Sequence, residues 1–349
     1  SFGFIGGSSG WAEYENTSEP PVKFVSDGSK VFGVTQGQES NYYIVNNLIQ
    51  LSPNANNTFS VLQKPLSSGQ SNTTLSNIPG VMAYDGKVNI VTEFNYLSSN
   101  RHNVSVIDIT GAKASSLLEF KPAYGLLSVV SGKFNADNSF DFVGIKAPAV
   151  STNPPIFLAF YKNTGSTSTA AFNEPVQLTL QNATGIGYDK IRDIVSGDFN
   201  NDEKTDILTI YRPQDGQCEI YVWENQGNNT LKAVKWKASH SFATPAITGR
   251  VVAGDFNGDG KLDLAAVENI NNADEQIAIH VWTNTGAATF SDPSVWFSST
   301  GGYKTSKIKG VVSGKFYNSD NKSEIVILYQ YTYPSKIRAH VFAPSTSEQ

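Results

Sequence analysis

The stretch Gly197-Asp-Phe-Asn-Asn-Asp-Glu-Lys-Thr-Asp206 returns almost unchanged as Gly254-Asp-Phe-Asn-Gly-Asp-Gly-Lys-Leu-Asp263. Two more divergent copies flank this pair, Gly132-Lys-Phe-Asn-Ala-Asp-Asn-Ser-Phe-Asp141 and Gly314-Lys-Phe-Tyr-Asn-Ser-Asp-Asn-Lys-Ser-Glu324. The glycines that begin the four copies lie 65, 57 and 60 residues apart. Repetition at a period of this length indicates an architecture in which each copy belongs to one supersecondary unit.

Each repeat contains the same series of short segments. An apolar run precedes the acidic loop, a β-branched run follows it, and an alternating run such as 278–282 leads to an Asn-x-Gly turn and a weaker strand. Four short antiparallel strands with a turn after each are the unit of a β-propeller. Two earlier units, with Asp-Gly turns at Asp27 and Asp85, keep the spacing. The sequence therefore predicts an all-β fold, in which residues 1–349 form a single β-propeller of six four-stranded blades, with seven blades as the alternative.

The two ends of the chain complement each other. The last repeat stops soon after its third strand, at Ala343-Pro344, whereas an extra segment that includes Phe2–Ile5 and Trp11–Tyr14 precedes the first repeat. We expect residues 1–16 to supply the strand that completes the last blade, because ring closure removes the free edges of a sheet.

Composition excludes several classes of protein. The net charge is −5, without a run of basic residues, so a nucleic-acid partner is not expected. Cys218 is the single cysteine, which excludes a disulfide scaffold. No apolar stretch approaches the ~18 residues that span a membrane, and the first residues lack the pattern of a signal peptide. Secreted and cytoplasmic locations both stay open.

The two best-preserved loops place oxygen-bearing side chains at loop positions 1, 3, 5 and 9, and at position 7 a lysine that offers its main-chain carbonyl. Ca²⁺ favours about six to eight oxygen ligands from a flexible loop, whereas Mg²⁺ tends to keep its waters. The alternative is a polar turn that binds nothing. The sequence predicts two structural Ca²⁺ sites, with the ligands Asp198, Asn200, Asp202, Lys204 and Asp206 in one loop and Asp255, Asn257, Asp259, Lys261 and Asp263 in the other.

Three positions depart from this loop pattern. Lys133 and Lys315 occupy position 1 of the divergent copies, where an ammonium would repel a cation. We expect these two copies to bind no metal and to pair the lysine with an acid of the same loop, namely Asp137, Asp141, Asp320 or Glu324. Glu203 stands where a glycine would fit most easily, which predicts a strained backbone at that position.

The Gly-Asp-Phe-Asn-x-Asp-x-x-x-Asp loops resemble those of FG-GAP (VCBS-type) repeats in integrin-α-like propellers. The resemblance is specific from residue 120 to 330 and weak before that. It implies calcium in the loop between the first two strands, on one face of the ring. The chain is most similar to stand-alone fungal lectins of the Psathyrella type, which implies carbohydrate binding. The family also includes adhesion proteins and domains attached to enzymes.

Tyrosines recur in the links between repeats, beside glycines. If the acidic loops lie on one face of the ring, these links and the turns after the second strands lie on the other face. An aromatic ring beside a charged or amide group is typical of a carbohydrate pocket. The alternative role for each tyrosine is packing between blades. The predicted ligand-binding residues are Tyr124, Tyr188, Tyr303, Arg212 and Asn269.

The function predicted from the sequence is a multivalent carbohydrate-binding protein, a lectin. Its expected partners are glycans or glycoproteins, and self-association is left open. Catalytic residues are not predicted, because no nucleophile, metalloprotease or phosphate-binding motif is present. Two alternatives remain: a polysaccharide-degrading hydrolase or lyase, and an adhesion or toxin-targeting module that binds a protein. An axial cluster of ionisable residues would favour an enzyme, whereas similar pockets in successive blades would favour the lectin.

Overall fold

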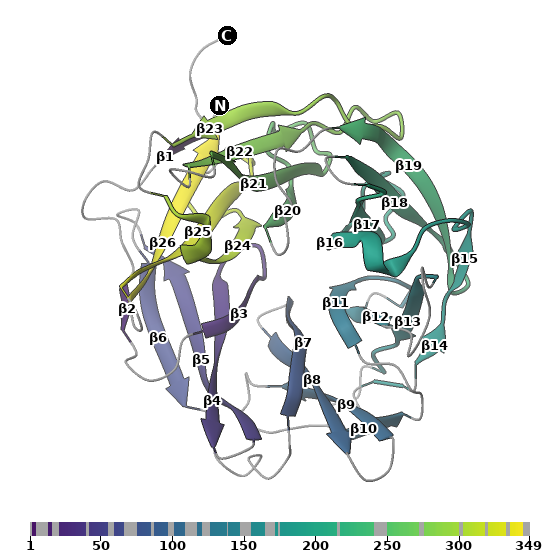
Figure 1. Cartoon of the computed structure of the whole chain (residues 1–349), viewed down its shortest axis with the longest axis horizontal. Helices are drawn as coiled ribbons and strands as arrows, with labels where there is room; N and C mark the ends of the chain where they lie inside the picture. Colours follow the sequence, from purple (N-terminus) through teal and green to yellow (C-terminus); the bar gives the residue numbers. More distant parts are fainter. Residues whose placement is uncertain are drawn as a thin grey trace.

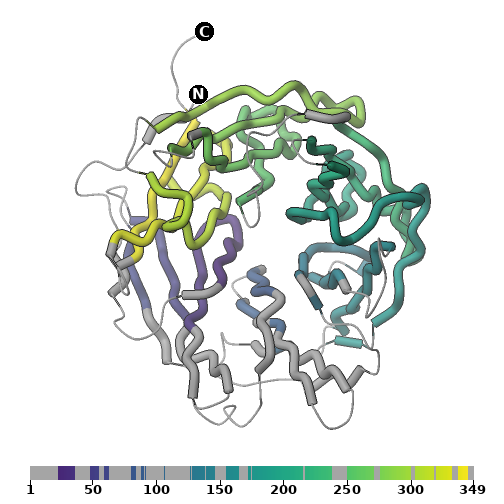
Figure 2. The backbone as a smooth tube through the Cα atoms, in the orientation of Figure 1, coloured from purple at the N-terminus to yellow at the C-terminus, as the bar shows by residue number. Residues whose placement is uncertain are grey.

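The strands are arranged as a ring around a central axis (Figure 1). The computed structural model describes residues 2–4, 13–15, 21–39, 42–54, 59–65, 75–84, 87–96, 101–108, 117–120, 126–137, 139–146, 155–164, 172–173, 175–214, 217–240, 250–271, 276–299, 303–317, 320–332 and 336–344. The trace advances around the ring in chain order, so the C-terminal strands lie beside the N-terminal ones (Figure 2). This arrangement confirms the predicted β-propeller built from antiparallel strands.

Three sheets come from the middle of the chain, and each begins with a strand at the centre of the ring (Figure 1). The first contains β11 (Leu126–Gly132), β12 (Asp141–Lys146), β13 (Phe157–Tyr161) and β14 (Val176–Gln177). The second contains β16 (Ile191–Gly197), β17 (Asp206–Tyr211), β18 (Cys218–Gly227) and β19 (Thr230–His240), with β15 (Thr179–Gln181) parallel to β19. The third contains β20 (Val251–Gly254), β21 (Asp263–Asn271), β22 (Gln276–Trp282) and β23 (Ser294–Ser298).

The N-terminal part of the chain forms one eight-stranded sheet. Its strands are β3 (Pro21–Ser26), β4 (Val31–Glu39), β5 (Tyr42–Pro53), β6 (Phe59–Pro65), β7 (Leu75–Tyr84), β8 (Lys87–Tyr96), β9 (Arg101–Asp108) and β10 (Leu117–Phe120). It contains two four-stranded meanders, β3–β6 and β7–β10, which are joined by the pair Tyr43↔Leu75 between β5 and β7.

The expected count of six or seven separate blades is therefore corrected. The described residues form five hydrogen-bonded sheets, since the first two predicted units join into one. The physical reason is the length of β5, whose twelve residues extend past its pairing with β6 and reach β7. The spacing of the repeats in the sequence shows where each unit begins, but it does not show whether strands of neighbouring units pair.

The fifth sheet joins the two ends of the chain. It contains β24 (Ile308–Gly314), β25 (Glu324–Thr332) and β26 (Lys336–Pro344). Two N-terminal strands, β1 (Phe2–Phe4) and β2 (Glu13–Glu15), both pair antiparallel with β26. We expected residues 1–16 to supply one closing strand. The structure has two short strands there, and both pair with β26.

Large apolar side chains fill the spaces between adjacent sheets. Trp223 on β18 is fully buried in a cluster with residues of the β11–β14 sheet. Trp282 on β22 is buried in a cluster with residues of the β16–β19 sheet, and it lies there with Trp236. Burial of this kind stabilises the ring mainly through the hydrophobic effect.

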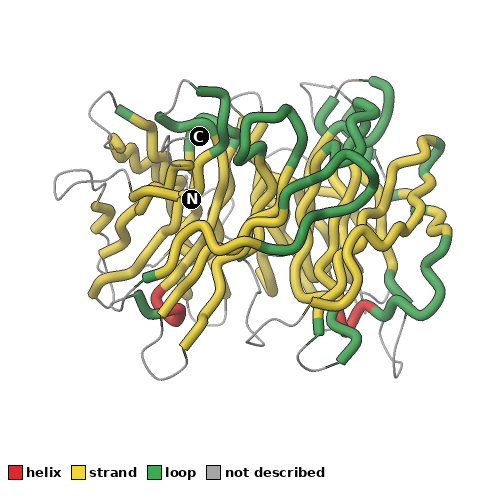
Figure 3. Tube along the Cα trace, turned by 90° about the horizontal axis from the view of Figure 1, so that it is seen from above, coloured by secondary structure: helices red, strands yellow, loops and turns green. Residues whose placement is uncertain are grey.

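The two faces of the ring carry different connections. The short 3-10 helices η2 (Tyr188–Lys190) and η3 (Thr305–Lys307) precede β16 and β24 and lie on one face, as Figure 3 shows. The acidic loops follow these inner strands and so lie at the opposite face, which is called the acidic-loop face below. The described part of the chain contains no helix with the length and hydropathy needed to cross a membrane.

Candidate functional site

The acidic loops wrap around their own first aspartate. Asp198 accepts hydrogen bonds from the backbone amides of Asp202 (3.0 Å) and Glu203 (2.8 Å). In the second loop, Asp255 accepts from Gly258 (2.6 Å) and Gly260 (2.9 Å). These contacts give both loops the same tight path, because a side-chain oxygen replaces the main-chain acceptor of a turn.

A lysine ammonium lies on each loop. Lys204 Nζ is 2.9 Å from Asp202 Oδ2, and Lys261 Nζ is 2.9 Å from Asp259 Oδ2. Both lysines come from loop position 7, where the sequence predicted that the main-chain carbonyl would bind calcium. In each loop a positive charge thus already lies against a predicted calcium ligand.

The acid at position 9 is the buried anchor of each loop. Asp206 and Asp263 are fully buried, and each accepts two backbone amides. Burial raises the pKa of Asp206 to about 7 and that of Asp263 to about 6; the amide hydrogen bonds oppose this rise, and the neighbouring loop acids add to it. The divergent copies keep the anchor as Asp141 and Glu324, so this acid serves the fold even where position 1 is lysine.

Two asparagines, which the sequence marked only as turn residues, hold these anchors and connect adjacent sheets. Asn284 Nδ2 donates to the carbonyl of Phe199 (2.8 Å), a residue of the preceding sheet's loop. Asn225 makes the same contact with Phe134 (3.0 Å). The signal available in the sequence was the recurrence of Asn at the same place in consecutive repeats.

The donor set fits a hard divalent cation. Its candidate ligand atoms are all oxygen, and the other acids of each loop add to the raised pKa of the buried anchor, which indicates concentrated negative charge. In each loop the lysine ammonium already lies against one of these carboxylates. Within the described ranges, however, no three His, Cys, Asp or Glu side chains meet closely enough to hold an ion, since the loop carboxylates bind backbone amides instead. Calcium therefore stays a prediction.

In the divergent loop after β11, the acid Asp137 forms its ion pair with a different lysine from the predicted Lys133. Asp137 pairs with Lys162, which follows β13, at 3.2 Å. Within the part of the chain that the structure describes, neither Lys133 nor Lys315 forms an ion pair. The expected partner was wrong: Lys162 at the end of the third strand, and not the lysine at position 1, pairs with Asp137.

Glu203 adopts a left-handed backbone with φ of 68°, as its place in the sequence predicted. Its equivalent in the second loop is Gly260, with φ of 84°. We expect Glu203→Gly to raise the free energy of unfolding by about 0.5–1 kcal/mol, because a left-handed non-glycine residue costs about 1–2 kcal/mol and glycine returns part of this as chain entropy. Urea unfolding measures the change. Glu203→Ala is the control: it keeps the strained backbone, and a matching gain there would contradict the explanation.

The buried carboxyl of Asp141 predicts a pH-dependent stability. Burial raises its pKa to about 6 from 3.8, opposed by the Asn163 amide and supported by the charge of Asp137. Because the folded pKa is the higher one, this stabilisation is complete below pH 3.8 and is lost as the pH rises through about 6. We expect wild-type protein to lose on the order of 2 kcal/mol between pH 4 and 7.5 relative to Asp141→Asn. Denaturant titrations across this range give the difference, and parallel curves would contradict it.

Four of the five predicted ligand residues lie where the topology placed them, away from the acidic-loop face. Arg212 follows β17, and its backbone amide donates to the carbonyl of Lys190 in η2 (2.9 Å). Asn269 on β21 reaches Thr305 of η3 through a 3.5 Å hydrogen bond. Tyr124 lies outside the described residues. The structure thus relates Arg212 to the η2 link and Asn269 to the η3 link, and does not gather them into one site.

The tyrosines of these links are packed against the core. Tyr303 contacts Tyr329 and His340, with ring centroids 5.2 Å away in each case, and its hydroxyl bonds to His340 Nδ1. Burial raises the pKa of Tyr303 above its usual range. Tyr188 is half-buried against the cluster between the β11–β14 and β16–β19 sheets. These contacts favour the packing role over ligand stacking.

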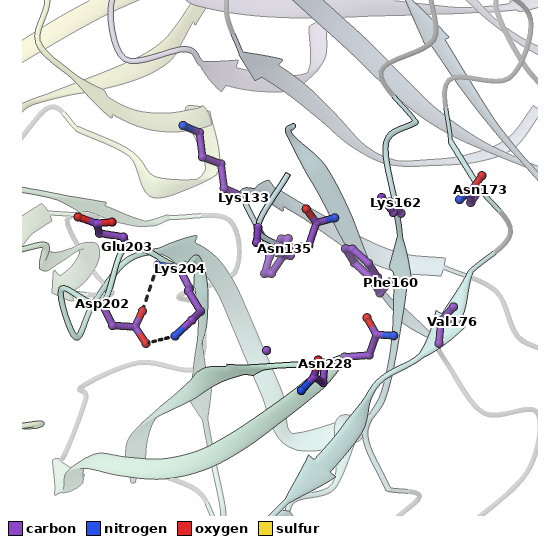
Figure 4. Close-up of a pocket in the computed structure, with 14 residues that line it drawn as sticks. Lys133, Asn135, Phe160, Lys162, Asn173, Val176, Asp202, Glu203, Lys204 and Asn228 are labelled. Carbon is purple, nitrogen blue, oxygen red and sulfur yellow. Dashed lines mark hydrogen bonds and ion pairs between the residues drawn. The ribbon is translucent and has the colours of Figure 1, made fainter. Parts of the chain in front are cut away.

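A pocket opens between two sheets on the acidic-loop face. It has a volume of about 800 Å³ and lies between the β11–β14 sheet and the β16–β19 sheet (Figure 4). This inter-blade pocket combines the divergent loop 132–141, the acidic loop 198–206 and the β18–β19 turn. The residues that line it are Lys133, Phe134, Asn135, Ala136, Phe160, Lys162, Asn173, Val176, Asp202, Glu203, Lys204, Gly227, Asn228 and Asn229.

Comparison with known proteins supports the repeat and the fold. Residues 198–266 match the FG-GAP-like repeat family model. A segment of 94 residues is 36% identical to protein linkin of Caenorhabditis elegans, and the match covers 25% of this chain and 15% of linkin. The chain therefore spans a small part of that relative's length.

Two solved structures share the overall arrangement. A triple mutant of AofleA from Arthrobotrys oligospora is similar with a TM-score of 0.50 and 11% identity, over 94% of this chain and 86% of AofleA. The α-L-arabinofuranosidase Arb93A of Fusarium graminearum, in complex with an iminosugar inhibitor, has a TM-score of 0.52 and 11% identity, over 94% of both chains. At this identity the likeness concerns the fold alone. The chain is thus a β-propeller that carries an FG-GAP-like repeat at residues 198–266.

Proposed function

We propose that the protein binds carbohydrate in the inter-blade pocket and holds Ca²⁺ in the loops 198–206 and 255–263. The pocket is the observation that carries the first part. Its volume of about 800 Å³ suits a small-molecule ligand, and its walls combine amide, ammonium and carboxylate groups. Sugar hydroxyls both donate and accept hydrogen bonds, so this mixture complements them.

The pocket lies on the face opposite to the one that the sequence favoured. None of the five residues predicted to bind ligand lines it, whereas the predicted calcium ligands Asp202 and Lys204 do. Val176, which is 48% exposed, adds an apolar surface for the C–H groups of a sugar.

Repetition of the pocket around the ring is limited. At the next junction the β18–β19 turn residues Asn228 and Asn229 are replaced by Ala287 and Ala288. We therefore propose one principal site at this junction and other sites of different composition, which revises the expected set of similar pockets.

The calcium proposal predicts two bound ions per chain. In isothermal titration we expect Asp198→Ala and Asp255→Ala each to remove one ion, while Asp137→Asn in a divergent loop leaves both. Calcium at ten times its dissociation constant should stabilise the fold by about 1.4 kcal/mol per site, because it binds the folded chain selectively. Thermal unfolding with calcium and with chelator measures this effect. Titration without heat of binding would contradict the proposal.

A glycan array with calcium present tests the carbohydrate proposal. The best ligand is then titrated against wild-type protein and Asn228→Ala/Asn229→Ala, for which we expect at least a tenfold loss of affinity. Ala288 already adopts a φ of 52° at the position equivalent to Asn229, and thermal unfolding checks that the variant, which also places alanine at the left-handed position 228 (φ of 49°), stays folded. Asn182→Ala is the control, because Asn182 has a similar φ of 57° outside the pocket. If no glycan on the array binds, the proposal is contradicted.

A further inference from the structure

The inter-blade pocket and the loop 198–206 share Asp202, Glu203 and Lys204. Lys204 donates twice to Asp202, from its backbone amide to Oδ1 (3.0 Å) and from Nζ to Oδ2 (2.9 Å), as the dashed lines in Figure 4 show. The side chains are 47% and 34% exposed, so solvent and ligands reach this ion pair. An exposed pair of this kind is weak and easily exchanged.

Lys204 lies in the combined field of the loop acids. Its pKa is raised above the usual value by the hydrogen bond and charge of Asp202, and the charges of Asp206 and Asp198 add to this. The ammonium thus interacts with three of the carboxylates that the proposed calcium ion needs. The ammonium occupies Asp202 Oδ2, so a divalent ion that binds both oxygens of this carboxylate would displace it from Asp202.

We propose that Lys204 couples the two sites: an ion in the loop 198–206 releases Lys204 into the inter-blade pocket, where its ammonium donates to oxygen atoms of the saccharide. This inference rests on the proposed carbohydrate function and adds a role for one residue and for calcium in that site. Calcium then strengthens saccharide binding, and the saccharide strengthens calcium binding by the same factor, because coupling between two sites is reciprocal.

The second loop provides an internal control. Lys261 pairs with Asp259 at the same distance, 2.9 Å, but it does not line the inter-blade pocket. Displacement of Lys261 by an ion therefore has no consequence for the saccharide. A change that acts only through general stabilisation would affect both lysines alike.

The test is a titration of the best array glycan into wild-type protein, Lys204→Met and Lys261→Met, each with saturating calcium and with chelator. Thermal unfolding first establishes that every sample is folded at the assay temperature. We expect wild-type protein and Lys261→Met to bind the glycan about fivefold more tightly with calcium, the low end of usual coupling, and Lys204→Met to show no calcium dependence. In the reverse titration, saturating glycan should raise the calcium affinity of one of the two sites by the same factor.

Equal glycan affinity with calcium and with chelator would overturn the coupling while the carbohydrate function stands. Loss of the calcium dependence in both lysine variants would also overturn it, since it would show general stabilisation. A glycan array without any hit would instead remove the carbohydrate function and the coupling with it.

Discussion

Replacing Asn284 by alanine is expected to lower the free energy of unfolding by about 3 kcal/mol. The side chain is 1% exposed and makes three hydrogen bonds, to the carbonyls of Phe199 (2.8 Å) and Leu262 (3.2 Å) and from the amide of Gly286 (2.9 Å). A net hydrogen bond contributes about 1 kcal/mol, and buried partners left without one add to the loss. Chemical denaturation of the purified variant gives the value.

The size of this effect depends on the position of Asn284 between two sheets. Its contact with Phe199 joins segments 85 residues apart, so its loss weakens the ring as well as the loop. Gln226→Ala is the control, because Gln226 is exposed next to the equivalent asparagine Asn225 and should change stability by less than about 0.5 kcal/mol. A loss below 1 kcal/mol for Asn284→Ala would show that the connection between sheets contributes little.

Replacing Gly314 by alanine is expected to cost about 3 kcal/mol, because the added methyl group meets backbone. A Cβ at this position would lie 2.7 Å from the carbonyl oxygen of Gly28 and 2.8 Å from the Phe316 ring. The same carbonyl accepts the amide of Lys315 at 2.7 Å, which joins the last sheet to the first. Overpacking costs about 1–3 kcal/mol, and losing this hydrogen bond adds to it.

Gly197→Ala is the matched control for this prediction. Gly197 is the equivalent position in another repeat, but there the Cβ would meet a terminal methyl group of Leu262, at 2.4 Å. A flexible side chain can move aside, so we expect a loss of about 1 kcal/mol. Thermal and denaturant unfolding of both variants compare the two junctions. Equal losses would mean that the backbone contact with Gly28 is not what limits the substitution.

These anchor glycines show why the repeat was visible in the sequence. Each lies where the loop of the next unit approaches the inner strand, so the same residue recurs at each such junction: Gly132 against Thr205, Gly197 against Leu262, Gly254 against Ser323 and Gly314 against Gly28. The sequence showed the recurrence and its period. It did not show what the glycines touch, because the contacting residue belongs to the next unit.

The candidate site was harder to predict from sequence. The acidic loops were visible as continuous motifs, and their shared path is confirmed by the hydrogen bonds of Asp198 and Asp255. The tyrosine motif was equally visible, but Tyr303 is packed among Tyr329 and His340. An aromatic residue beside glycine has the same appearance in sequence whether its ring faces a ligand or a neighbouring strand.

The sequence by itself determined the all-β propeller, the places of the four repeated loops and the segment that closes the ring. Strand alternation and turn residues are visible in short stretches of sequence, and the repeat period is visible when these stretches are compared. Only the tertiary structure decided that the first two units form one sheet and that the inter-blade pocket lies on the acidic-loop face. The walls of this pocket come from Lys133, Asp202 and Asn228, which are far apart in the chain. The shape of a pocket between two sheets depends on how such distant side chains pack. A local sequence pattern therefore does not predict it.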